Sequence, residues 1–323
     1  MINKNDSGQR LDKFMAKTFP NVPPSMMYRA IRRKDIKLGG RRCQPDTRLN
    51  EGDVLEIYLK DEFLAQPDYK SRDAQPDFML AGRQLRVAYE DENILIADKP
   101  QGLIVHTDEH YQSDTLIARI QRYLFEKGEY DPAAEHSFAP ALVNRIDRNT
   151  GGLVIAAKNA EALRILNEKM RGGEIHKKYL CLVHGVPAKR SDILRGYLEK
   201  NEAQNRVYIE QRSTEKTKQI ITKYTVLASR GGVSLLEVEL LTGRTHQIRA
   251  HLASIGHPLV GDGKYGTNER NKGSGFSKQA LYSYKLRFGF TGPAGSLGYL
   301  NGLEITAGQV PFAEEFMSPE NGK

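Results

Sequence analysis

The chain has 323 residues with a formal net charge of +8, which is enough length for about two domains and makes a polyanionic partner plausible on charge alone. Its two cysteines, Cys43 and Cys181, exclude a disulfide framework, and no run approaches the roughly 20 apolar residues of a membrane-spanning helix. With no apolar signal core at the amino terminus, these features predict a soluble, cytoplasmic protein.

Residues 1–60 are predicted to form a small domain of two helices followed by strands. Apolar residues between 11 and 19 keep helical spacing, and Pro23-Pro24-Ser25 ends this helix and starts the next. Residues 36–42 are expected to turn back at two glycines, and residues 53–58 to close the domain as a further strand.

A dense run of positive charge lies in this domain. Seven cations stand within fourteen residues, with Asp35 as the only acid among them: Arg29, Arg32, Arg33, Lys34, Lys37, Arg41 and Arg42. Most such runs are solvated helix surfaces. Phosphate contact is the alternative, and the remainder of the chain has to decide between them.

Residues 61–84 lack periodicity and are predicted to be a linker, after which residues 85–323 form the second domain. This domain is expected to begin with two strands around the turn at 91–93 and to contain helices at 114–125 and 159–170, each starting at a capping residue. Strands interrupted by a few helices predict an α+β fold with a mixed, mainly antiparallel sheet.

The segment 144–152 places Asp147 between two arginines in a glycine-containing turn that runs into the apolar strand 153–157. Opposite charges stabilise the carboxylate anion, which could be a nucleophile, a metal ligand or half of a salt bridge. A calcium loop is excluded because Lys158 occupies the position of its last ligand. An Asp that merely caps a turn is the ordinary alternative.

A second polar segment, 242–252, follows the predicted strand 233–241. Thr245 is expected to cap a helix whose apolar stripe is Ile248, Leu252 and Ile255. Arg249 lies beside that stripe and can reach a carboxylate.

His246 and His251 lie in the same predicted helix. They are five residues apart, the wrong spacing for two metal ligands on one helix face, so we expect polar helix residues and no metal site.

Together these segments resemble RluA-type pseudouridine synthases. Residues 144–152 are similar to the family's His-Arg-Leu-Asp-x-x-Thr-Ser-Gly signature, with Asn144 in place of His, and residues 177–185 to its tyrosine strand. Residues 243–252 are similar to Gly-Arg-x-His-Gln-Ile-Arg-x-His, and residues 98–103 to the Lys-Pro-x-Gly entry. The likeness runs from about residue 86 to 311, in the expected order.

The resemblance implies isomerisation of uridine to pseudouridine in RNA, in the central cleft of a bent sheet and without a cofactor or metal. It implies Asp147 as nucleophile and Arg249 as its ion-pair partner. Arg145 would fill the space of the flipped nucleotide and contact phosphate, Tyr179 would stack on the base, and Leu281 would line the uracil pocket. From the residues alone, Tyr179 could equally be a packed strand tyrosine and Leu281 a core leucine.

Residues 10–60 are similar to the small RNA-binding domain named after ribosomal protein S-four. Beside an RNA-modifying domain, phosphate contact becomes the better explanation of the positive run, with Arg32, Arg33, Lys37 and Arg41 as the predicted contacts. The expected partner is RNA, above all large-subunit ribosomal RNA or an assembling subunit, and the expected state a monomer.

Three other functions stay open from the sequence. A transfer-RNA pseudouridine synthase would share the same residues, and a ribosome-assembly factor could keep the fold without activity. A glycoside-cleaving enzyme is disfavoured, because such enzymes generally need a pair of carboxylates and no second acid is evident near Asp147.

Overall fold

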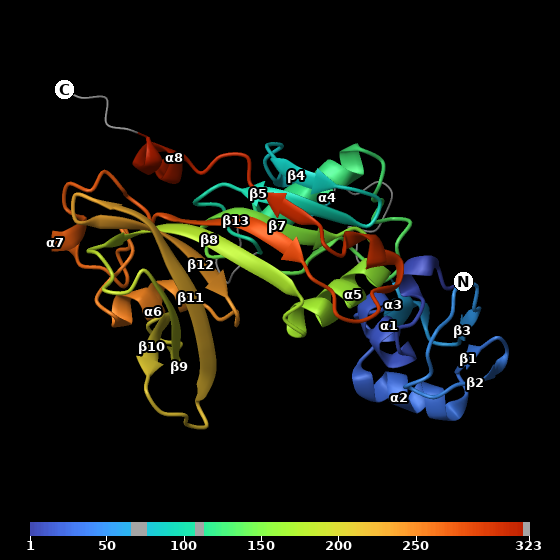
Figure 1. Cartoon of the computed structure of the whole chain (residues 1–323). Helices are drawn as coiled ribbons and strands as arrows, with labels where there is room; N and C mark the ends of the chain where they lie inside the picture. Colours follow the sequence, from blue (N-terminus) through green and yellow to red (C-terminus); the bar gives the residue numbers. More distant parts are fainter. Residues whose placement is uncertain (66–75, 107–112, 319–323) are drawn as a thin grey trace. The chain divides into compact units, whose positions relative to one another are not determined.

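The computed structural model describes residues 1–65, 76–106 and 113–318 (Figure 1). Contacts divide the chain into two compact units. The first unit comprises Met1–Gln84, Thr107–Ala141 and Ala157–Arg164, and the second comprises Leu85–His106, Leu142–Ala156 and Ile165–Lys323. Ten residues of the predicted linker, 66–75, lie outside the described part, so the domain bounds 1–60, 61–84 and 85–323 stay predictions.

The first unit begins with the predicted helices and strands. Helix α1 (Leu11–Thr18) and helix α2 (Pro24–Arg33) pack their apolar faces on one core, and Pro24 starts α2 at a position where a helix tolerates proline. A three-stranded sheet follows, consisting of β2 (Arg41–Arg42), β1 (Ile36–Leu38) and β3 (Leu55–Ile57) in that order.

The remainder of the first unit is mainly helical. Thr115 accepts a hydrogen bond from the Ala118 amide at 3.1 Å and so caps α4 (Leu116–Glu126). Phe78, in the short helix η3 (Asp77–Leu80), packs edge-on against Phe125. Asn159 caps the start of the other predicted helix, α5 (Ala160–Arg171), of which residues up to Arg164 belong to the first unit and the remainder to the second. A further short helix, α3 (Asp61–Leu64), lies in the predicted linker.

The second unit is built on an 11-stranded sheet (Figure 1). From edge to edge its main path is β10 (Arg206–Glu210), β9 (Ser191–Asn201), β11 (Thr217–Arg230), β12 (Val233–Leu240), β8 (Ile175–His184), β13 (Leu281–Phe288), β7 (Gly151–Ala157), β5 (Ile94–Lys99) and β4 (Val87–Glu90). Two short strands, β6 (Ala141–Leu142) and β14 (Glu304–Thr306), pair with β7 and β13. The predicted α+β class and mainly antiparallel sheet are therefore confirmed.

Burial along the strands follows their place in the sheet. Every residue of β5 and β7 is buried, as expected for strands covered on both faces, and β7 runs parallel to β13. By contrast, most of β9 is exposed or half-buried, and its buried Leu198 packs in one cluster with Ala250 of helix α6 (Gln247–Ser254). Outside the sheet, the described chain also forms η1 (Lys4–Asp6), α7 (Asn268–Asn271), η4 (Gly295–Leu300) and α8 (Pro311–Met317).

Helix α6 begins differently from the prediction. Thr245 does not cap it; the capping position is taken by His246, which has a left-handed backbone with φ of 54° and makes no side-chain capping bond. Of the predicted stripe, Ile248 and Leu252 are buried, but Ile255 ends the helix and is 38% exposed. The prediction was wrong at both ends because local spacing does not report where the chain must leave a helix.

No helix among the described residues is long and apolar enough to cross a bilayer.

Gly152 is required where β7 meets β13. Its φ is +112°, and a Cβ there would overlap the backbone carbonyl of Ser283. We expect Gly152→Ala to lower the free energy of unfolding by about 3 kcal/mol, from backbone strain plus overpacking. Gly128→Ala is the control, because φ there is +77° but the space is open, and its expected cost is about 1 kcal/mol. Equal losses in denaturant titrations would show that the contact with Ser283 is not limiting.

Candidate functional site

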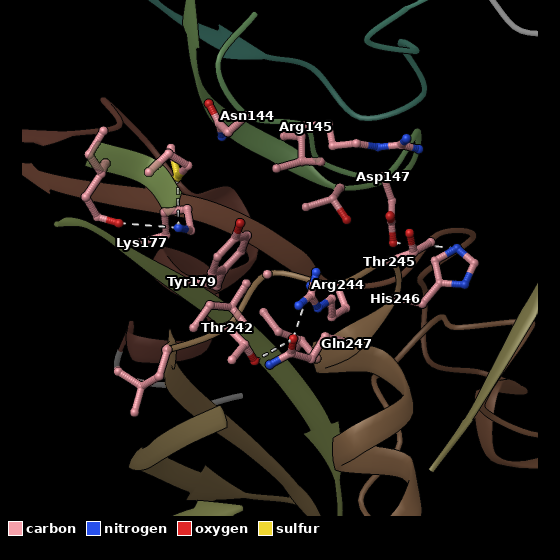
Figure 2. A pocket seen from close by; sticks show the side chains of 18 of the residues that line it. Asn144, Arg145, Asp147, Lys177, Tyr179, Thr242, Arg244, Thr245, His246 and Gln247 are labelled. Carbon is pink, nitrogen blue, oxygen red and sulfur yellow. Dashed lines mark hydrogen bonds and ion pairs between the residues drawn. The ribbon is translucent and has the colours of Figure 1, made fainter. Parts of the chain in front are cut away.

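A pocket of about 600 Å³ opens in the second unit (Figure 2). Its walls come from three segments that are distant in the sequence, 143–150 before β7, 170–179 from the end of α5 into β8, and 240–249 from β12 into α6, together with Leu281 of β13. All five residues predicted for the catalytic domain line it, namely Asp147, Tyr179, Arg249, Arg145 and Leu281.

Arg249 connects two carboxylates inside this pocket wall. Its Nε and Nη2 donate to both oxygens of Asp262 at 2.7 and 2.9 Å, and its Nη1 donates to Asp147 Oδ2 at 3.1 Å. Asp262 is fully buried, and only 7% of Arg249 is exposed. The bidentate pair fixes the plane of the guanidinium, so its third contact points in one direction, toward Asp147.

Burial opposes the charge on both members of the inner pair. For Asp262, the hydrogen bonds and charge of Arg249 outweigh burial, so the pKa of that carboxyl lies below its ordinary value. For Arg249, the two carboxylates outweigh burial and raise the pKa of the guanidinium. Both groups are therefore charged at neutral pH.

A buried lysine holds the turn that carries Asp147. Lys99 is 0% exposed, and its Nζ donates to the carbonyl oxygens of Pro100, Leu103 and Arg148 at 3.0, 2.7 and 3.0 Å. Burial lowers the pKa of Lys99 to about 7, and the charge of Asp147 partly offsets that effect. Lys99, the lysine of the Lys-Pro-x-Gly segment, thus holds the backbone of Arg148, the residue next to Asp147.

Gln247 holds the turn that precedes α6, on the opposite wall of the pocket. The Gln247 amide accepts from Thr242 Oγ1 and the Arg244 amide, and it donates to the Ile221 carbonyl and Thr222 Oγ1. All of its polar atoms are therefore used within the fold, which makes it a structural residue.

His246 lies with its Nε2 3.9 Å from Asp147 Oδ2. Its Nδ1 is 3.0 Å from the Tyr265 hydroxyl, whose oxygen already accepts from the Val207 amide. Because that hydroxyl is free to donate to Nδ1, the tautomer that uses every group carries its proton on Nε2, facing Asp147. Burial lowers the pKa of His246 to about 4, so it is a neutral donor at pH 7.

Tyr179 and Leu281 form apolar surface in the pocket. Tyr179 is 5% and Leu281 4% exposed, and they come from β8 and β13. Burial raises the pKa of Tyr179 to about 12, so its phenolate is not populated at neutral pH. A flat ring face with a neutral hydroxyl suits stacking on a base.

The sequence neighbours of Asp147 are not its partners. Arg148 donates to the Gly102 carbonyl at 3.1 Å, and Arg145 is exposed. No ion pair joins either arginine to Asp147 in the described part of the chain, so the expected local charge stabilisation comes instead from Arg249, 102 residues away. Adjacent residues on an extended turn project in different directions.

The basic cluster, defined as the seven cations between residues 29 and 42, lies in the first unit on α2 and the β1–β2 turn. Six are exposed, and Lys37 is half-buried with its ammonium 5.3 Å from the centre of the Tyr58 ring. Among the described residues, none of the seven takes part in an ion pair. Arg32, Arg33, Lys37 and Arg41 are thus available to an external anion.

Four residues that shape the site were given no role in it by the sequence: Lys99, His246, Tyr265 and Asp262. A signal existed for Asp262, since an arginine inside a buried helix needs a counter-ion. No signal existed for the contact of His246 with Tyr265, which depends on its left-handed backbone. No group of three or more metal-ligating side chains occurs within the described ranges.

Two family models match the chain. Residues 93–254 match the RNA pseudouridylate synthase family, and residues 9–55 match the S4 domain.

Among its relatives is the ribosomal large subunit pseudouridine synthase C of Haemophilus ducreyi, which is 30% identical over 294 residues, covering 89% of this chain and 86% of that protein. The Escherichia coli protein of the same name is 30% identical over 302 residues, with 89% and 87% covered. Among solved structures, human RNA pseudouridylate synthase domain containing 1 has a TM-score of 0.56 and 23% identity, covering 72% of this chain and 86% of that one. At that identity the likeness concerns the fold alone.

Asp262 should be needed for stability at neutral pH, and its contribution should be lost in acid. Asp262→Asn leaves Arg249 without its buried counter-charge, and we expect a loss of about 3–5 kcal/mol at pH 7. Since the folded-state pKa of Asp262 is depressed, its contribution is present above the ordinary value and is lost as pH falls through the lower one. The gap between wild type and variant should therefore narrow in acid. Asp192→Asn, at the surface pair with Lys189, is the control and should change little; a constant gap would contradict the assignment.

Proposed function

Since the chain belongs to the RNA pseudouridylate synthase family, we propose that its substrate is large-subunit ribosomal RNA and that Asp147 is the nucleophile. The observation that carries the second part is the Asp147–Arg249 contact in a pocket walled by Tyr179. Pseudouridine formation detaches uracil from its sugar at N1 and rejoins it through C5. It therefore needs a nucleophile, a sheltered base and no redox partner.

Asp147 is suited to covalent catalysis. A carboxylate can bond to the substrate and later depart, which divides one difficult step into two. Arg249 keeps the carboxylate charged and aimed, and the fixed Arg249–Asp262 pair means that no reorganisation is needed when the substrate enters. His246 offers a neutral N–H on the same side of Asp147, where a sugar oxygen can accept it.

The base must leave its stack to reach this pocket, and extrusion costs a few kcal/mol. Tyr179 can return part of that energy by stacking on the uracil, while Leu281 supplies apolar contact. Arg145 is exposed at the rim and unpaired with Asp147, which leaves it available for a phosphate or for the space that the nucleotide vacates. Burial raises the pKa of Tyr179, so forming its phenolate costs free energy. Tyr179 can act as a proton acceptor only if the bound substrate lowers this free-energy cost.

The choice of ribosomal RNA has two supports. Relatives that span most of the chain are named for the large ribosomal subunit. The S4 domain carries the basic cluster, whose exposed guanidinium groups suit a phosphate backbone and not a particular base. We therefore propose ribosomal RNA as the substrate. A transfer-RNA substrate and a purely structural role in ribosome assembly are the alternatives that the test distinguishes.

Asp147→Asn is expected to abolish pseudouridine formation, with a rate loss of at least about 10⁴-fold. Cells lacking the gene would be complemented with wild type or with this variant, and pseudouridines mapped in ribosomal and transfer RNA. Sites missing from large-subunit RNA with the variant alone would support both parts of the proposal. If the missing pseudouridines lie in transfer RNA, transfer RNA is the substrate instead of ribosomal RNA. If no pseudouridine is lost in any strain, the assembly-factor function remains.

The basic cluster should set the salt dependence of RNA binding. In Arg32→Gln/Arg41→Gln, each lost phosphate contact should reduce the slope of log affinity against log salt by roughly one. Lys13→Gln/Lys17→Gln, which removes two exposed cations from α1, is the charge-matched control. Equal slopes for the two variants in filter-binding titrations would contradict a role of the cluster in phosphate contact.

A further inference from the structure

The pocket has a second polar end, formed by Lys177 of β8. Lys177 stands two residues before Tyr179 on the same strand, so both side chains project from one face of the sheet, and both line the pocket. Figure 2 shows Tyr179 between Lys177 on one side and Asp147 on the other. A carboxylate, an aromatic ring and an ammonium group thus follow one another along the pocket.

Lys177 has poor acceptors within the protein. Its Nζ lies 3.2 Å from the Met170 sulfur, a weak acceptor, and 3.3 Å from the Ile175 carbonyl oxygen, at the long end for a hydrogen bond. Over the described ranges no carboxylate lies within ion-pair distance of it. Its neighbour Lys178, on the opposite face of the strand, binds Glu237 at 2.9 Å.

This environment is unfavourable for a cation. Burial lowers the pKa of Lys177, and no neighbouring charge offsets that effect. A buried ammonium group carries three hydrogen-bond donors. Burying it costs free energy unless acceptors satisfy those donors. The structure therefore leaves, on the pocket wall, a donor whose acceptors within the protein are weak.

The symmetry of uracil gives this donor a partner throughout the reaction. In the six-membered ring, C4 lies opposite N1 and C2 lies opposite C5. The carbonyl oxygen opposite the sugar is therefore O4 while the base is attached through N1, and O2 once it is attached through C5. Figure 2 shows Asp147, Tyr179 and Lys177 in this order, so with the sugar at Asp147 and the ring on Tyr179 that oxygen would face Lys177 in both states.

We propose that Lys177 is a further catalytic residue, whose ammonium donates to the uracil carbonyl opposite the sugar and stabilises the charge of the detached base. This inference rests on the proposed function. The N1–C1′ bond breaks with its electron pair going to the ring, where N1 and both carbonyl oxygens share it, and the Asp147 carboxylate bonds to C1′. A ring electron pair then forms the C5–C1′ bond as Asp147 leaves, C5 loses its proton to solvent, and N1 gains one. Nothing is oxidised.

A lysine suits this role better than a fixed amide. Its ammonium is a compact charge with three donors on a flexible stem, so it can follow one oxygen out and another in as the ring turns. Removing a preorganised donor to a developing anion typically costs about 10²–10³-fold in kcat. Interactions made mainly with the detached base change kcat and leave KM nearly unaltered.

The test is Lys177→Met, which keeps most of the length of the side chain and removes its charge. Total RNA from cells lacking the gene, tritiated at C5 of uridine, would be the probe, and tritium release the readout. We expect kcat to fall about 10²-fold or more with KM within about threefold, and Lys177→Arg to recover part of the loss. Lys178→Met is the matched control on the opposite face. A Lys177→Met kcat within threefold of wild type would overturn the inference.

A second measurement separates contact from folding. RNA containing 4-thiouridine offers a weaker acceptor at C4, so wild type should slow on it more than Lys177→Met does. Equal slowing would also overturn the inference. Asp147→Asn is run in the same assay: if that variant stays active, the proposed nucleophile fails, whereas a loss confined to Asp147→Asn removes only the role of Lys177.

Discussion

The site depends on one guanidinium shared by two carboxylates. Asp262, fully buried, binds Arg249 at two nitrogens and so sets the plane of the group, and the remaining nitrogen reaches Asp147. Of the three groups, only Asp147 has substantial contact with the pocket, with 24% of its side chain exposed. The buried pair is therefore the fixed part, and Asp147 is the part available to a substrate.

The other contacts serve this arrangement. Lys99 ties the backbone after Asp147 to the loop that follows β5, and Gln247 ties the turn before Arg249 to β11. Both side chains spend their polar atoms on backbone or hydroxyl groups, so neither competes for the substrate. This geometry occurs in a chain that belongs to the RNA pseudouridylate synthase family and contains an S4 domain.

Much of the fold followed from local patterns. Helices α1, α2, α4 and α5 and strands β5, β7 and β12 were predicted close to their observed places, because their apolar periodicity matches the face that each buries. The start of α6 was predicted wrongly at Thr245, since a left-handed residue at His246 cannot be read from propensity. The roles of Asp147, Tyr179, Arg249, Arg145 and Leu281 remain predictions, although all five line one pocket.

By itself the sequence determined five residues that line the candidate site, because motifs keep residue types at fixed spacings and the family resemblance names their order. The resemblance also implied the pair of Asp147 with Arg249, and only the tertiary structure decided what holds that pair in place. The arginines flanking Asp147 point elsewhere, and its partner comes from a helix 102 residues later, held by Asp262. The reason is physical: charge complementarity acts through space, and the directions of side chains are set by the sheet and helix that carry them.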